Sequence, residues 1–238
     1  MQKKFKNLIS ENAQDVVEIF SALLKLPSSM LEIYPALNIM FKTMQFVRSQ
    51  VMLKRFATFI KIINFELEKD IIKFLKKIHN EDVVEFLHDS AKRSIEEKSE
   101  LLRIAIAIHT ASVIKRNCVR LQDVKIYRSL KDLSDKEIYA FLKFIEIDRS
   151  QDKEEFNFSY SSNYDEVIAD EISLPLNEYD DFVKELFEHL KSLNFFNNGN
   201  IVIKSESKSD FHIGRPSAHF QELVEILFMA KKLIVELK

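Results

Sequence analysis

The stretch IEEKSELLRIAIAIHTASVIKR, residues 95–116, carries the strongest helix signal in the chain. Its apolar residues recur at spacings of three and four, as they do on one face of a helix. Small residues at positions 105, 107, 111 and 112 let a neighbouring helix approach closely. Ser94 and Glu97 have the spacing of a capping box, so we expect this helix to begin at Ile95.

Most of the chain shares this helical spacing. Ser134 and Glu137 form another capping-box pair.

The chain has only two glycines, Gly199 and Gly214. Because phosphate-binding loops usually depend on glycine, the commonest nucleotide-binding designs do not fit the residues before Gly199.

Apolar residues three and four apart predict further helices over residues 15–25, 36–64, 65–79, 81–90, 123–130, 135–147, 178–194 and 219–237.

The composition changes at Asp148. The next thirty residues or so are polar and acidic and are typical of a connector, with a short strand predicted over 155–160. Asn198-Gly199, flanked by apolar residues, predicts a hairpin with strands over 201–204 and 210–213.

A helix, a hairpin and a closing helix follow one another at the C-terminus, which is the layout of a winged-helix-like module. The predicted fold class is therefore mainly α, with an N-terminal helical bundle and a small C-terminal α+β module. The predicted segments are a helical domain over 1–147, an acidic connector over 148–177 and the winged-helix-like module over 178–238.

Charge is unevenly distributed, although the net charge is only −2. Residues 33–64 hold five basic residues and no acid, whereas residues 152–188 hold twelve acids and two bases. Lys54 and Lys61 are seven residues apart, so they share one face of the predicted basic helix. Such a helix can bind anionic lipid, nucleic-acid phosphate or an acidic protein. It can also pack in the core, with its lysine stems reaching out to water.

Residue types that carry catalysis are scattered. No two of the six histidines have the i, i+4 spacing of a helical zinc site, and the single cysteine, Cys118, excludes a Cys-x-x-Cys site and an internal disulfide. Arg116 and Arg120 favour the thiolate form of Cys118, but a nucleophile also needs a base in contact, and His109 is about two helical turns away. We expect that the protein is not an enzyme and that it has no cofactor, no metal site and no small-molecule substrate.

Three short motifs carry a resemblance to known proteins: IEEKSELL at 95–102, LSDKEI at 133–138 and LKSLNFF at 190–196. With them the chain resembles a group of uncharacterised bacterial helical proteins, some labelled abortive-infection-like. Those proteins usually have a glycine where this chain has Asn194, and a glycine in the last helix that is missing here. The resemblance implies a bacterial or phage-related setting and no known chemistry.

These patterns predict a non-enzymatic interaction or regulatory protein of the cytoplasm or of the membrane periphery, with a role in bacteria–phage conflict implied by the resemblance alone. Self-association or a protein partner is the expected mode of action. The alternative is a nucleic-acid- or membrane-surface-binding module that uses the basic helix 33–64. The residues expected to carry the interaction are Lys54, Arg55 and Lys61 on the basic side and Asp180, Asp181 and Glu185 on the acidic side.

Overall fold

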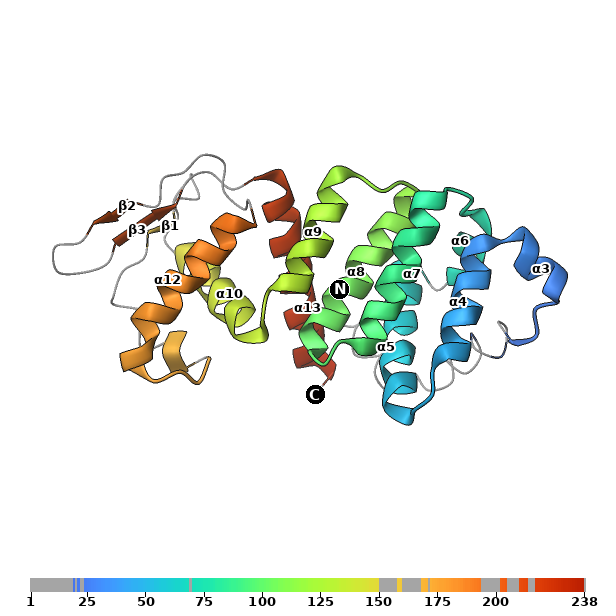
Figure 1. The fold of residues 1–238 in the computed structure, drawn as a ribbon, viewed down its shortest axis with the longest axis horizontal. Coiled ribbons are helices and arrows are strands. Elements are labelled where there is room, and N and C mark those ends of the chain that lie inside the picture. The colour runs from blue at the N-terminus through green and yellow to red at the C-terminus, as the bar shows by residue number, and fades with distance from the viewer. Residues whose placement is uncertain are drawn as a thin grey trace. The chain divides into compact units, whose positions relative to one another are not determined.

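The computed structural model is mainly helical, as predicted (Figure 1). The chain divides into two compact units, one of Met1–Tyr127 with Phe228–Lys238 and the other of Arg128–Leu227. This division follows spatial contacts and differs in its bounds from the three segments read from composition, which stay a prediction. The structure describes residues 19, 21, 24–68, 70–149, 158–159, 168–170, 172–193, 202–204, 210–213 and 217–237.

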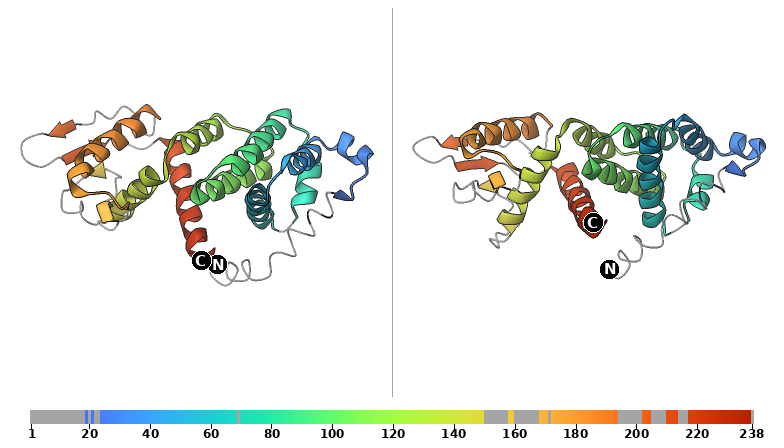
Figure 2. Two further views of the ribbon diagram at one scale, coloured as in Figure 1. Left: turned by 60° about the horizontal axis from the view of Figure 1, so that its bottom comes forward. Right: turned by 90° about the horizontal axis from the view of Figure 1, so that it is seen from below.

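The first unit is built around helix α8. Twelve of the seventeen residues of α8 are buried, because this helix is apolar on nearly all sides and packs against both α5 and α7. Both views of Figure 2 show the neighbouring helices of this unit in blue to green. Its helices are α3 Ser28–Ile33, α4 Pro35–Phe46, α5 Gln50–Glu66, α6 Ile71–Lys77, α7 Glu81–Glu96, α8 Glu100–Arg116, the first part of α9 Leu121–Asp132 and the last part of α13 Ala218–Leu237.

The predicted basic helix is interrupted. Helix α4 ends at Phe46 and α5 begins at Gln50, so the expectation of one helix up to Asn64 was wrong. Ser49 caps α5, because its hydroxyl oxygen accepts a hydrogen bond from the Met52 backbone N–H at 3.1 Å. Apolar spacing continues across this break and therefore could not reveal it.

The start of α8 also differs from the prediction. Ser99, not Ser94, caps the helix, and its Oγ accepts from the Leu102 backbone N–H at 3.1 Å. Glu97 supports this cap by accepting from the Ser99 backbone N–H at 3.0 Å. Ser94 is buried within α7, which continues to Glu96 instead of ending at residue 90. Asp70 caps α6 in a similar way, so the helix expected over 65–79 is split at residues 67–70.

The second capping box is confirmed. Glu137 accepts from the Ser134 backbone N–H at 2.7 Å, and Ser134 Oγ accepts from the Glu137 backbone N–H at 3.3 Å. The two bonds are reciprocal and begin helix α10, Asp135–Arg149, where the spacing placed it.

The second unit joins helices to a small sheet. The sheet has the antiparallel order β1-β3-β2, with Ile203 of β2 opposite Phe211 of β3 and Phe158 of β1 opposite Ile213. Aromatic side chains fill the helical core: Phe141 meets Phe220 edge-on at 5.4 Å between ring centroids. The elements are the last part of α9, α10, β1 Phe158–Ser159, α12 Leu176–Ser192, β2 Val202–Lys204, β3 Asp210–Ile213 and the first part of α13.

Some predicted features lie outside the described residues. They include most of the helix expected over 15–25, most of the acidic connector and the Asn198-Gly199 turn.

Candidate functional site

The turn between α4 and α5 stands clear of the core of the first unit. No residue from 44 to 55 is buried, whereas Thr43 before this stretch and Phe56 after it are. We call residues 42–54 the α4–α5 corner. It lies at the lower ends of α4 and α5 in Figure 1.

The α4–α5 corner exposes apolar and basic side chains together. Phe46 is 50% exposed, Val51 59% and Leu53 43%, so three exposed apolar side chains occur close together in the sequence. The Arg48 guanidinium lies over the Phe46 ring, 5.9 Å from its centroid. The exposed cations of the corner are Lys42, Arg48 and Lys54.

The three predicted basic interaction residues differ in their surroundings. Lys54 is exposed in the corner. Arg55 is partly buried, and its Nη1 donates to the backbone carbonyls of Ile95 at 3.0 Å and Glu96 at 3.2 Å. Its charge thus stabilises the C-terminal end of α7, where helix carbonyls lack internal partners. Lys61 is partly buried further along α5.

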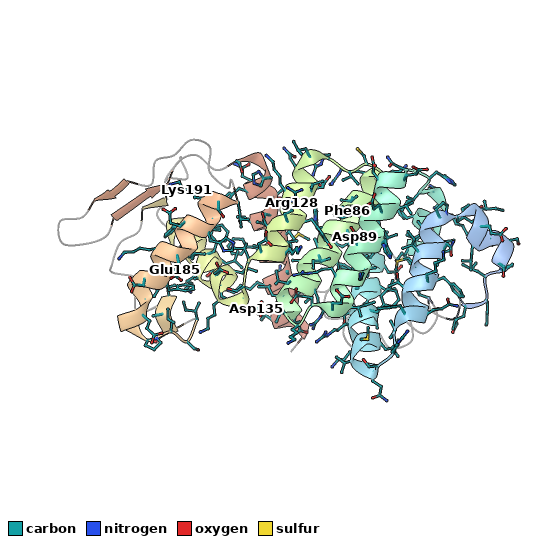
Figure 3. All side chains as sticks on the ribbon, in the orientation of Figure 1. Phe86, Asp89, Arg128, Asp135, Glu185 and Lys191 are labelled. Carbon is teal, nitrogen blue, oxygen red and sulfur yellow. The ribbon has the colours of Figure 1, made fainter. Side chains whose placement is uncertain are left out.

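Helix α12 exposes a row of carboxylates, which we call the acidic stripe. Its members are spaced by three, four and three residues and therefore lie on one face of the helix. Lys184 pairs with Asp181 at 3.7 Å, and Lys191 with Glu188 at 4.0 Å, both within the helix. Figure 3 marks Glu185 and Lys191 on α12. The stripe comprises Glu178, Asp181, Glu185 and Glu188.

Of the three predicted acidic residues, the structure therefore places Asp181 and Glu185 in the acidic stripe. The side chain of Asp180 lies outside the described residues. The predicted contact between the basic and acidic groups stays a prediction, because they belong to different units.

A fully buried carboxylate, Asp123, joins α8 to α9. Its Oδ1 accepts from Arg116 Nη2 at 2.7 Å and from Arg120 Nη2 at 3.0 Å, and lies 3.2 Å from His109 Nε2. Its Oδ2 accepts from the Arg120 backbone N–H at 2.7 Å. Phe86, marked on α7 in Figure 3, stands edge-on to the His109 ring with 5.4 Å between centroids.

Hydrogen bonds decide the charge of this carboxylate. Burial by itself raises the pKa of Asp123, but hydrogen bonds from His109 and Arg120 and the charge of Arg116 outweigh it. The pKa therefore lies far below its ordinary range, and Asp123 is ionised at any physiological pH. Since Asp123 and His109 are both sealed from solvent, this cluster can hold the α8–α9 loop but cannot reach a substrate.

The arginines beside Cys118 are directed elsewhere than predicted. Cys118 is exposed in the α8–α9 loop, and both Arg116 and Arg120 donate to Asp123. The expectation that Cys118 is not a catalytic nucleophile stays a prediction.

A second histidine–carboxylate pair lies in the other unit. His189 Nδ1 is 2.6 Å from Glu137 Oε1, which ties the last turn of α12 to the capping box of α10. Burial by itself raises the pKa of Glu137, but hydrogen bonds from His189 and Ser134 outweigh it, so this pKa is lowered.

A third histidine contact, between Ser217 and His219, is buried. Ser217 Oγ lies 2.9 Å from His219 Nδ1 at the start of α13, and both residues are buried. A serine in this position is not accessible to a substrate.

Within the described part of the chain, no group of three or more His, Cys, Asp or Glu side chains could hold a metal ion. None of the helices described there combines the length and the apolar character needed to cross a bilayer.

Sequence reasoning missed the exposed apolar side chains of the corner and the Asp123 cluster. Val51 had the spacing of a core residue, whereas Phe46 did not belong to the predicted apolar face, and both are exposed. The Arg120–Asp123 spacing of three was the one visible signal for the cluster, since a carboxylate at that position reaches back to the backbone N–H at the helix start.

No model of a known protein family matches the chain, and neither does any curated protein or any solved structure. The resemblance to abortive-infection-like proteins therefore stays a prediction.

Proposed function

We propose that this is a non-enzymatic interaction protein that docks onto a negatively charged partner through the α4–α5 corner. The observation that carries this proposal is the composition of the corner. Three exposed cations, Lys42, Arg48 and Lys54, surround three exposed apolar side chains in a stretch of chain, 33–64, without a single acid. Exposed patches of this kind are typical of interaction sites.

Where charge alone is considered, self-association is one form of this proposal. The acidic stripe of one copy offers Asp181 and Glu185 to Lys54 of another copy. Charge complementarity of this kind steers partners and selects orientation more than it adds affinity. Arg55 contributes less, because it is already bound to the end of α7.

The test is a charge reversal with a matched control. Lys54→Glu is expected to weaken self-association at low salt by about three- to tenfold, and Glu185→Lys in the same chain is expected to restore it. Lys92→Glu, on an exposed lysine of α7, makes the same charge change outside the corner and is expected to have no effect. Mass photometry and sedimentation velocity measure the association.

Two results would contradict self-association through the corner. A protein that stays monomeric at high concentration and low salt refutes self-association. Equal association of Lys54→Glu and Lys92→Glu refutes the role of the corner.

For the C-terminal segment we propose a winged-helix-like module that packs or associates instead of binding DNA. The order of α12, β2, β3 and α13 supports this reading. A DNA-reading helix needs a basic surface, whereas the acidic stripe of α12 repels phosphates. Lys191→Glu is therefore expected to leave any mobility shift of duplex DNA unchanged; a shift that this substitution abolishes contradicts the proposal.

The link to bacteria–phage conflict is a separate proposal that only the resemblance supports. The genes beside this one test it, because a defence cassette supports the link and a metabolic operon contradicts it.

A further inference from the structure

We infer that the negatively charged partner of the α4–α5 corner is an anionic lipid bilayer, into which Phe46, Val51 and Leu53 insert. This inference rests on the proposed function, since it names the partner of the same corner. It adds an apolar contribution that charge pairing alone does not require.

The geometry of the corner suits insertion. Its three apolar side chains lie within eight residues of one another around a turn, and no residue from 44 to 55 belongs to the core. Exposed side chains at such a turn can enter a bilayer interface without a complementary cavity. Apolar side chains that enter the interface bind in proportion to the area that they bury.

The charges of the corner suit an anionic surface. Lys42 is one helical turn from Phe46, and Lys54 is one turn from Val51 on the other helix, so cations flank the apolar side chains on both sides. Each basic residue held near an anionic leaflet strengthens binding about fivefold. One negative charge lies at the border of the corner, on Glu96 at the end of α7, where Arg55 is bound.

A second copy of the chain matches the corner less well. The acidic stripe complements its cations, but among the described residues α12 has no large apolar side chain that is strongly exposed. Binding there leaves Phe46, Val51 and Leu53 without apolar partners. Nucleic-acid phosphates have the same shortcoming, whereas an anionic bilayer supplies both negative charge and an apolar interior.

The first experiment uses the absence of tryptophan from the chain. Phe46→Trp places a single tryptophan at the corner, and Leu121→Trp places one at a residue of the same unit that is 73% exposed and outside the corner. We expect the emission of Phe46→Trp to shift to the blue with vesicles of phosphatidylcholine and phosphatidylglycerol, and not with phosphatidylcholine alone. The emission of Leu121→Trp is expected to stay unchanged.

The second experiment measures affinity by flotation with the same vesicles. Phe46→Ser combined with Leu53→Ser is expected to weaken binding about tenfold or more, whereas Leu121→Ser is expected to bind like the unaltered protein. All these side chains are exposed, so circular dichroism is expected to show intact folding.

The outcomes separate this inference from the proposed function. If the protein ignores vesicles but self-associates or binds nucleic acid in a way that Lys54→Glu abolishes, the inference is wrong and docking through the corner stands. If the serine substitutions leave vesicle binding unchanged, insertion is wrong. If Lys54→Glu changes no association with vesicles, nucleic acid or a second copy, both proposals are wrong.

Discussion

Asp123 shows how a single buried charge can stabilise a loop. The carboxylate is removed from water, which is costly unless the charge is paired and hydrogen-bonded. Arg116, Arg120 and His109 together supply these bonds, from both sides of the α8–α9 loop. The loop is thereby held in place even though Cys118 at its tip is exposed.

Asp123→Ala is expected to lower the free energy of unfolding by about 3–5 kcal/mol, because it leaves the converging donors without their buried acceptor. Urea denaturation followed by circular dichroism measures this. Asp132→Asn removes an exposed carboxylate from the same helix and is expected to change the free energy by less than about 0.5 kcal/mol. Similar effects of the two substitutions contradict the role of Asp123.

Glu137 makes the stability of the second unit depend on pH. Its pKa is lowered in the folded state from an ordinary value of 4.5, so near that pH the unfolded chain binds more protons. The stabilisation is therefore present above pH 4.5 and is lost as the pH falls through the folded-state pKa.

Glu137→Gln removes this titration. The melting temperature of the unaltered protein is expected to fall more steeply below about pH 4.5 than that of the variant. Scanning calorimetry measures both, with Glu188→Gln on the exposed acidic stripe as the control. If the melting temperatures of Glu137→Gln and of the unaltered protein fall in parallel as the pH is lowered, the prediction is wrong.

At the scale of elements, caps determine where helices begin. Apolar spacing runs without interruption through the end of α4, whereas five polar residues, 96–100, follow Ile95 at the end of α7. The side chains of Ser49 and Ser99 set the starts of α5 and α8. A cap satisfies backbone N–H groups that have no partner inside the helix. The corner exists because the cap at Ser49 divides one apolar run into two helices.

Two serines of the same segment test this view. Ser99→Ala is expected to lower the free energy of unfolding by about 1 kcal/mol, because it removes the cap of α8. Ser94→Ala is expected to be neutral or slightly stabilising, because this buried hydroxyl finds no hydrogen-bond partner among the described residues. If Ser94→Ala lowers the melting temperature more than Ser99→Ala does, Ser94 is the cap, as the sequence predicted.

At the scale of the whole molecule, the chain separates its charges. The basic residues of the corner belong to one compact unit and the acidic stripe to the other. A net charge of −2 therefore conceals two surfaces of opposite sign. Each can attract a partner that the net charge alone would not suggest.

The salt concentration separates the electrostatic contribution to vesicle binding from the apolar contribution. Vesicle binding is expected to weaken as salt rises, since the screening length falls from about 10 Å at 0.1 M to about 3 Å at 1 M. At high salt, the unaltered protein is expected to keep a residual affinity for the vesicles. The double variant Phe46→Ser/Leu53→Ser is expected to lose it. Complete loss of binding by the unaltered protein at high salt contradicts insertion. Flotation over a series of salt concentrations measures it.

The sequence by itself determined the helical class, the capping box at Ser134 and Glu137, and the segregation of charge. These features depend on neighbours three or four residues apart or on composition, so they are local. Only the tertiary structure decided which apolar residues lie inside. Phe56 is buried and Val51 is exposed although both fit helical spacing, because burial depends on which helices pack against each side chain. For the same reason the bonds that converge on Asp123, including that from His109 fourteen residues away, appear only once α8 and α9 lie together.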